Sequence, residues 1–280
     1  MRVFKTIRDE GSASPVAWAR RGWAGRLLAA AIKTRRPSTL IVSMPRSGSS
    51  WVGDMMGRSA DALYLREPVT QGDSAHYRKG TVFEPDEPDI ADSYRRLADK
   101  AFLGWPDFPE SIVRAPAQWA LKERRERRLV IKEVNPRAVA WYLKRYRPRL
   151  IFLVRHPVAV ALSHVKQGWM PDEPAAWADN GEWQGMNLRA AWNVVEDYPE
   201  RAVVSYEDLC LDPLGHFRRL FDFAGLAWDD SSRDLIACYS ADNDRRIEAW
   251  RDAVSTENAR AQREQYRAYD LPWYREDAVW

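Results

Sequence analysis

The chain has 280 residues, enough to bury the core of one α/β domain, and its 45% hydrophobic and 30% charged content is typical of a folded globular protein. The 43 Lys and Arg residues against 40 Asp and Glu leave a net charge of +3, which argues against general nucleic-acid binding. Fold class and function therefore have to be inferred from local patterns.

Two features bear on the cellular compartment. The cysteines, Cys210 and Cys238, lack CxxC spacing, so we expect neither a metal site nor a disulfide framework, and a cytoplasmic location is favoured. No stretch reaches the roughly 18 consecutive apolar residues of a membrane span, and no cleavable signal peptide is expected.

Positive charge is concentrated at the N-terminus. Residues 1–36 contain nine Lys or Arg and two acids, which gives a local net charge of +7. Within this segment, residues 15–36 place Trp, Leu and Ile among six basic residues, which predicts a basic amphipathic helix. Such a helix either packs on the domain with a solvated basic face or rests on an anionic membrane surface. We divide the chain into this segment, residues 1–37, and a single domain, residues 38–280.

The following elements are predicted in chain order. Residues 39–43 form a short apolar run that leads through a Ser/Gly turn into helical spacing, which indicates a buried strand, a turn and a helix. Residues 68–90 are rich in Gly, Pro and Asp and predict a long loop. Further strands are predicted at 62–65, 129–132, 150–154 and 202–205, and helices at 91–103, 111–122, 136–145, 158–168 and 214–224.

Alternating strands and helices imply crossover connections and hence a mainly parallel sheet with helices on both faces. The predicted fold class is therefore α/β. Ligands of such sheets bind beyond the carboxyl ends of the strands.

The first candidate binding segment follows the first strand. Its glycine lets the backbone approach a ligand, its helix start offers unpaired amides, and its Arg and Ser side chains add donors for a phosphate or sulfate group. GxxxxGK[ST] is absent, so neither a usual nucleoside-triphosphate loop nor its metal site is expected. The alternative is an ordinary serine-capped helix. The segment comprises Arg46, Ser47, Gly48, Ser49, Ser50 and Trp51.

The second candidate segment follows the strand at 150–154. Pro157 suits the first turn of a helix, which leaves Arg155 at the strand end and Ser163 about two turns along. Taken alone, Arg155 could equally form a surface salt bridge.

Together, the segments PRSGSSW and LVRHPVAVALS resemble the two segments of the sulfotransferase family that bind 3′-phosphoadenosine 5′-phosphosulfate (PAPS). The resemblance covers about residues 38–226, includes VSYEDL, and implies the P-loop-kinase-like sulfotransferase fold. It implies that Arg155 and Ser163 hold the 3′-phosphate, and that Trp51 and Tyr206 lie near the nucleotide. It also implies that the 5′-phosphosulfate is held by Arg46, Ser47, Gly48, Ser49 and Ser50.

The chain departs from cytosolic members of the family. Many of them have Lys at the position of Arg46, and Lys-Thr-His where this chain has Lys132, Glu133 and Val134. The histidine that usually acts as the base is therefore missing, and the C-terminal Arg-Lys-Gly that completes the 3′-phosphate site is not found.

A carboxylate can replace histidine as the base. Glu67 starts the predicted long loop, and its position resembles a glutamate of carbohydrate 6-O-sulfotransferases and tyrosylprotein sulfotransferases. We expect Glu67 to be the base, with His76 as runner-up; the alternative for Glu67 is a surface charge paired with Arg66. Lys132 is expected to stabilise charge on the leaving phosphate together with Arg46, unless it merely ends a strand.

The resulting hypothesis is a metal-independent enzyme that transfers the sulfuryl group of PAPS to a hydroxyl of a carbohydrate, a glycolipid or a glycosylated small molecule. The alternatives are sulfation of a non-sugar alcohol or phenol, a nucleoside-triphosphate-dependent kinase, and a non-catalytic nucleotide-binding module. Tryptophans of residues 68–125 and 227–280, Trp280 included, are expected to shape the acceptor pocket. Whether the protein forms an oligomer is left open.

Overall fold

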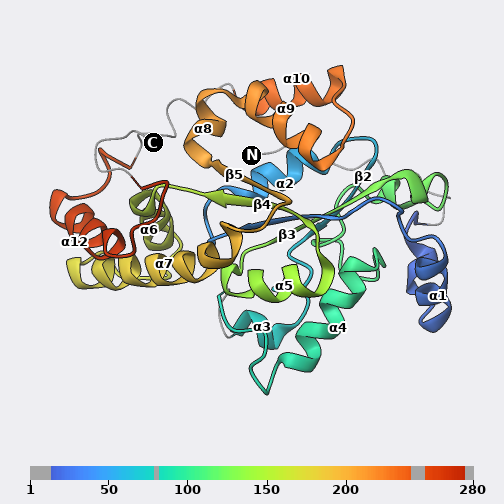
Figure 1. The fold of residues 1–280 in the computed structure, drawn as a ribbon, viewed down its shortest axis with the longest axis horizontal. Helices are drawn as coiled ribbons and strands as arrows, with labels where there is room; N and C mark the ends of the chain where they lie inside the picture. Colours follow the sequence, from blue (N-terminus) through green and yellow to red (C-terminus); the bar gives the residue numbers. More distant parts are fainter. Residues whose placement is uncertain (1–13, 79–81, 241–249, 275–280) are drawn as a thin grey trace.

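A computed structural model describes residues 14–78, 82–240 and 250–274 (Figure 1). Trp280 lies outside the described residues. The centre is a five-stranded sheet of order β2-β3-β1-β4-β5, in which every neighbouring pair is parallel. The strands are β1 (Thr39–Ser43), β2 (Ala62–Arg66), β3 (Arg128–Glu133), β4 (Arg149–Val154) and β5 (Arg201–Ser205).

Helices cover both faces of the sheet (Figure 1). The α-helices are α1 (Trp23–Ala31), α2 (Ser49–Met56), α3 (Ser74–Arg78), α4 (Ala91–Phe102), α5 (Val139–Tyr146), α6 (Pro157–Lys166), α7 (Pro174–Val195), α8 (Tyr206–Leu211), α9 (Pro213–Ala224), α10 (Asp230–Ser240) and α12 (Thr256–Arg267). Short 3₁₀ helices are η1 (Ala17–Arg20), η2 (Pro116–Trp119), η3 (Arg124–Glu126) and η4 (Pro136–Ala138).

The sheet has an apolar core on each face, which explains why its strands are continuous apolar runs in the sequence. Side chains alternate between the faces of a strand, so Leu40 and Val42 enter one core and Ile41 enters the other. The first core is closed by residues of α4, α5 and α7, and the second by residues of α2, α9 and α10.

The strand register places the candidate segments at one edge of the sheet. Arg66 lies opposite Lys132 at the end of β2, and Val154 lies opposite Ser205 at the end of β4. Because the strands are parallel, the loops after β1, β2, β3 and β4 all leave from the carboxyl edge.

The five predicted strands and the helices α4, α5, α6 and α9 are confirmed, but two predicted helices are wrong. Residues 111–122 contain an isolated bridge from Val113 to Leu65 and the short η2, because Ala115 has a positive φ of 47° and Pro116 follows it. The helix expected over residues 15–36 is divided at Gly22, which has a φ of 56°, into η1 and α1.

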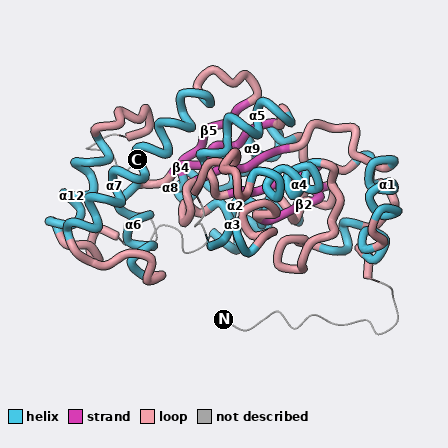
Figure 2. The backbone as a smooth tube through the Cα atoms, turned by 90° about the horizontal axis from the view of Figure 1, so that it is seen from below, coloured by secondary structure: helices cyan, strands magenta, loops and turns pink. Residues whose placement is uncertain are grey.

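The N-terminal segment lies against the domain. Trp18 donates its indole N–H to the carbonyl of Trp119 at 3.1 Å, and Trp105 donates to the carbonyl of Ala19 at 2.8 Å. Figure 2 shows α1 at one end of the molecule and α12 at the other. None of the helices in the described part of the chain has the length and apolar character needed to cross a membrane.

Candidate active site

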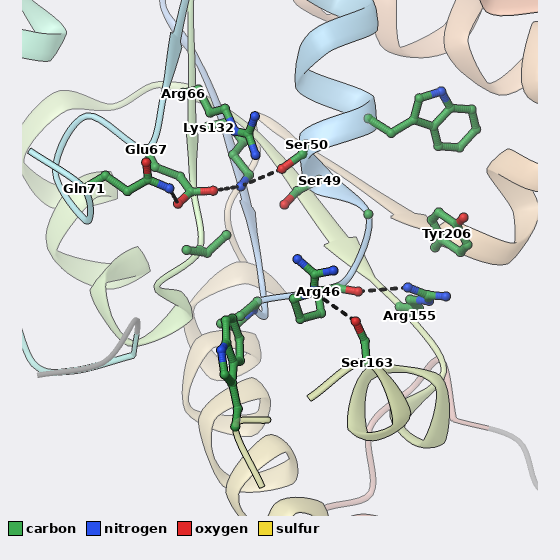
Figure 3. Close-up of a pocket in the computed structure, with 15 residues that line it drawn as sticks. Arg46, Ser49, Ser50, Arg66, Glu67, Gln71, Lys132, Arg155, Ser163 and Tyr206 are labelled. Atoms are coloured by element: carbon green, nitrogen blue, oxygen red, sulfur yellow. Dashed lines mark hydrogen bonds and ion pairs between the residues drawn. The ribbon is translucent and has the colours of Figure 1, made fainter. Parts of the chain in front are cut away.

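A cavity of about 330 Å³ lies at the carboxyl edge of the sheet (Figure 3). Both candidate binding segments line it, together with residues that follow β2 and β3. The lining residues are Pro45, Arg46, Gly48, Ser49, Ser50, Trp51, Arg66, Glu67, Gln71, Lys132, Val134, Arg155, Ser163, Trp169 and Tyr206.

The loop between β1 and α2 forms one wall. Gly48 has a φ of 89°, a conformation that glycine adopts without steric cost. A Cβ atom at Gly48 would overlap the ring of Tyr206. The hydroxyl of Ser43 donates to Ser49 at 2.8 Å, which fixes the first turn of α2, and Ser47 within the loop is buried and does not line the cavity. The first amides of a helix lack partners in the preceding turn, which makes the start of α2 suited to an anion.

The second segment meets the first directly. Arg46 donates from Nε to the Ser163 hydroxyl at 2.9 Å, and Arg155 donates to the carbonyl of Arg46 at 2.9 Å. Arg46 itself has a positive φ of 70°, a strained conformation for a residue with a side chain. Two segments more than 100 residues apart thus form one cationic wall.

Helix α8 supports this wall from behind. The guanidinium of Arg155 lies 4.3 Å from the ring centroid of Tyr206, within the range of a cation–π contact. Glu207 is buried and accepts the backbone N–H of His156 at 3.1 Å, and burial raises the pKa of its carboxyl. Trp51 meets the Tyr206 ring edge-on at a centroid distance of 5.9 Å.

An ion pair between Glu67 and Lys132 forms the opposite wall. Both side chains are buried, and Gln71 also donates to the Glu67 carboxylate. Lys132 lies 3.4 Å from the hydroxyl of Ser50 (Figure 3), so it connects the carboxylate to the first loop. Burial lowers the pKa of Lys132, and the carboxylate of Glu67 opposes that shift.

The backbone of Glu67 is held in an unusual conformation. Its φ is 53°, and its N–H donates to the carbonyl of Lys132 at 2.6 Å. Such a conformation persists only where the surrounding structure holds it, and here the bond to the carbonyl of Lys132 does so. Because its side chain is buried and paired with Lys132, Glu67 is not the surface charge paired with Arg66 that the sequence left as the alternative.

The structure places His76 away from the cavity. Its ring is fully buried, with Nδ1 2.9 Å from the carbonyl of Val69 and Nε2 2.6 Å from the hydroxyl of Ser93. Because both ring nitrogens have partners in the core, His76 does not reach the groups around Glu67, and its candidacy as the base is not supported by this geometry.

Two other histidines are buried near the second segment. His164 lies 3.0 Å from the amide nitrogen of Asn180, and burial lowers its pKa to about 4. His156 stacks on Trp250 at a centroid distance of 4.3 Å, and burial lowers its pKa to about 3.

Sequence reasoning missed three cavity residues that carry donors or a flat ring: Arg66, Gln71 and Trp169. Arg66 and Gln71 flank Glu67 closely enough to have been included. Trp169 follows α6 and lies 6.0 Å from the guanidinium of Arg46, a contact that no local pattern indicates. No group of three or more His, Cys, Asp or Glu side chains in the described residues is arranged to hold a metal ion.

Comparison with solved structures gives several sulfotransferases. One from Alicyclobacillus acidocaldarius is 13% identical over 81% of this chain and 100% of that chain, with a TM-score of 0.42. A mouse sulfotransferase complexed with PAP is 18% identical over 76% of this chain and 69% of that chain, with a TM-score of 0.43. One from Mycobacterium tuberculosis H37Rv is 14% identical over 90% of this chain and 81% of that chain, with a TM-score of 0.48. Comparison with curated proteins gives no match.

A comparison with protein-family models is more decisive. The model described as the sulfotransferase family matches residues 37–230, well over half of the chain. This range contains all five strands, both candidate binding segments and the Glu67–Lys132 pair. The chain belongs to the sulfotransferase family.

Proposed function

We propose that this protein transfers the sulfuryl group of PAPS to a hydroxyl of an acceptor, with Glu67 as the base. The observation that carries the proposal is the convergence of two anion-binding segments and one buried acid–base pair on a single cavity. The Arg46–Ser163 and Arg155–Arg46 contacts, both 2.9 Å, put the segments within reach of one nucleotide.

The residues present fit the two anionic ends of PAPS. Arg155 Nε and the indole N–H of Trp51 are buried without a hydrogen-bond partner, which is costly unless a ligand supplies one. Arg155 and Ser163 would hold the 3′-phosphate, and the rings of Trp51 and Tyr206 would flank the adenine. The 5′-phosphosulfate would be held by Arg46, Ser47, Gly48, Ser49 and Ser50.

Glu67 and Lys132, which form the wall opposite the anion-binding segments, would carry out the transfer. The acceptor oxygen forms a bond to sulfur as the bond from sulfur to the phosphate oxygen breaks, which leaves adenosine 3′,5′-bisphosphate. The acceptor proton passes to the Glu67 carboxylate. Lys132 and Arg46 stabilise the negative charge that grows on the leaving phosphate, and the buried site strengthens that stabilisation.

A sugar hydroxyl, free or carried by a glycolipid or glycosylated small molecule, is the acceptor that we propose. Trp169 offers a flat ring, and Arg66 and Gln71 offer donors beside Glu67, a combination that suits a ring with several hydroxyls. The second candidate is a non-sugar alcohol or phenol, for which the ring of Trp169 alone would suffice.

The first experiment separates binding from turnover. Adenosine 3′,5′-bisphosphate should raise the Tm of the wild type and of Glu67→Gln alike, whereas Glu67→Gln should lower kcat by about 10²-fold or more. The matched control is Glu182→Gln, an exposed carboxylate on α7, which should change neither quantity. Transfer of label from PAPS to saccharides, glycolipids and phenols identifies the acceptor.

Three results would contradict the proposal in whole or in part. Stabilisation by ATP with magnesium but not by the bisphosphate would indicate a kinase, and bisphosphate binding without transfer to any acceptor class would indicate a non-catalytic module. Wild-type turnover in Glu67→Gln would remove Glu67 as the base.

A further inference from the structure

The outward face of α1 exposes large apolar side chains. Trp23 and Leu27 are 77% and 61% exposed, although most large apolar residues of the described chain are in the cores. They are four residues apart, so they lie side by side on one face of the helix. The opposite face, with Gly25 and Ala29, is buried against the domain.

Basic side chains surround this apolar pair. Residues 14–36 contain six Lys or Arg and no Asp or Glu. All six are exposed: Arg20, Arg21, Arg26, Lys33, Arg35 and Arg36. On a helical projection at 100° per residue, Arg26 falls beside Trp23 on the exposed side of α1, and Lys33 follows two residues after the end of the helix. The exposed face of α1 thus combines an apolar pair with a cationic side chain, and the other five basic residues lie just before or just after the helix in the sequence.

The surface has a fixed orientation relative to the cavity. Arg35 donates its N–H to the carbonyl of Arg125 at 3.2 Å, just before β3 begins, and Thr39 starts β1 a few residues later. This surface therefore lies at the amino edge of the sheet, whereas the cavity lies at the carboxyl edge. Both views show α1 at one end of the molecule with its outer side uncovered by other elements (Figures 1 and 2).

We propose that this surface, defined as Trp23 and Leu27 with the six basic residues of 14–36, docks the protein on an anionic lipid bilayer. Tryptophan and leucine side chains insert at the headgroup level, and Lys and Arg residues are attracted to anionic lipids. A second copy of this chain fits less well, because a two-fold interface would bring two identical cationic surfaces together.

The chemistry of the surface predicts reversible binding. A nine-residue helix with two large apolar side chains inserts little area, so electrostatic attraction has to contribute most of the affinity. Attraction of this kind is screened by salt. Binding should therefore require anionic lipid and weaken strongly between low and high ionic strength.

Flotation of the full chain with lipid vesicles tests the proposal. The wild type should bind vesicles of phosphatidylcholine with 30% phosphatidylserine about tenfold or more better than pure phosphatidylcholine vesicles, and 0.5 M salt should release it. Trp23→Ala/Leu27→Ala and Arg26→Gln/Lys33→Gln should each reduce binding by about tenfold.

Matched controls distinguish vesicle binding through this surface from nonspecific binding through other exposed apolar or basic residues. Leu211→Ala removes a leucine that is 60% exposed on α8, and Arg218→Gln/Arg219→Gln removes two exposed charges on α9. These controls should bind vesicles like the wild type. All variants should keep the wild-type Tm and its increase with adenosine 3′,5′-bisphosphate, which shows that they are folded and that vesicle binding is independent of the proposed function.

The proposal is overturned if the wild type does not float with anionic vesicles, if it binds neutral vesicles equally well, or if the α1 variants bind like the controls. A concentration-dependent dimer that disappears in Trp23→Ala/Leu27→Ala, without vesicle binding, would assign the surface to a second copy of the chain instead.

Discussion

Lys132 and Glu133 are consecutive residues of β3 that hold the same loop from two sides. Lys132 pairs with Glu67, and the buried carboxylate of Glu133 accepts the backbone N–H of Val69 at 2.7 Å. The Thr70 hydroxyl donates to the other oxygen of Glu133 at 2.6 Å. The loop that presents Glu67 to the cavity is therefore anchored to the strand by a residue that does not line the cavity.

Glu133 should make stability depend on pH. Burial raises the pKa of its carboxyl from the ordinary value of 4.5 to about 7. The folded state thus binds a proton more tightly than the unfolded state, so the associated stability is fully present below about pH 4.5 and is lost as pH rises through about 7. Urea unfolding between pH 5 and 8 should show this decline in the wild type and a smaller one in Glu133→Gln. Parallel pH profiles in the two proteins would show that Glu133 does not titrate in this range.

At the scale of elements, α8 connects the parts of the proposed nucleotide site. Although it has only six residues, it stacks Tyr206 on Arg155, packs the same ring against Gly48 and binds the end of β4 through Glu207. Its first turn is capped by Ser205, which accepts the N–H of Asp208 at 2.9 Å.

Gly48→Ala should damage this junction. The added Cβ overlaps the Tyr206 ring, and the positive φ of 89° adds the usual penalty of about 1–2 kcal/mol for a side chain. Gly168→Ala is the matched control, because Gly168 has a φ of 69° with no atom within 4 Å of the added Cβ. Gly168→Ala should lower the unfolding free energy by the backbone penalty alone, whereas Gly48→Ala should lower it further and weaken bisphosphate binding about tenfold or more. Equal effects on both properties would contradict the role of the Gly48–Tyr206 contact.

The strands could be predicted because they are buried on both faces, which makes β1 and β4 continuous apolar runs. Helix α7 could not be predicted from the sequence, although it has 22 residues. Its buried face includes Gly181, Gln184, Gly185 and Asn187, so it carries little helical hydrophobic period. Gly181 allows the close approach of the α12 backbone, a contact that depends on tertiary structure.

The two binding segments of the site were recognisable because each is a short continuous motif after a strand. The roles of His76 and Trp169 were not, because they depend on contacts between distant segments. His76 lies in the same loop as Glu67, yet its partner Ser93 is on α4 and draws the ring into the core.

At the scale of the whole molecule, the cavity and the proposed docking surface lie at opposite edges of the sheet. The cavity lies at the carboxyl ends of the strands, and α1 lies near their amino ends. A protein docked through α1 would accordingly present its cavity away from the plane of the bilayer, which favours acceptors that arrive from the aqueous side.

The position of Cys210 gives the molecule a built-in reporter. This thiol is only 2% exposed and is packed beneath Tyr206 and Trp51, whereas Cys238 is exposed on α10. An alkylating reagent should modify Cys238 at once and Cys210 only when α8 separates from the first loop. Mass spectrometry of the modified chain should show that adenosine 3′,5′-bisphosphate slows alkylation of Cys210 but not of Cys238. If the bisphosphate slows alkylation of neither thiol, the nucleotide binds elsewhere. The rate at which Cys210 is alkylated thereby reports how often the proposed nucleotide site opens, and Cys238 serves as the internal standard.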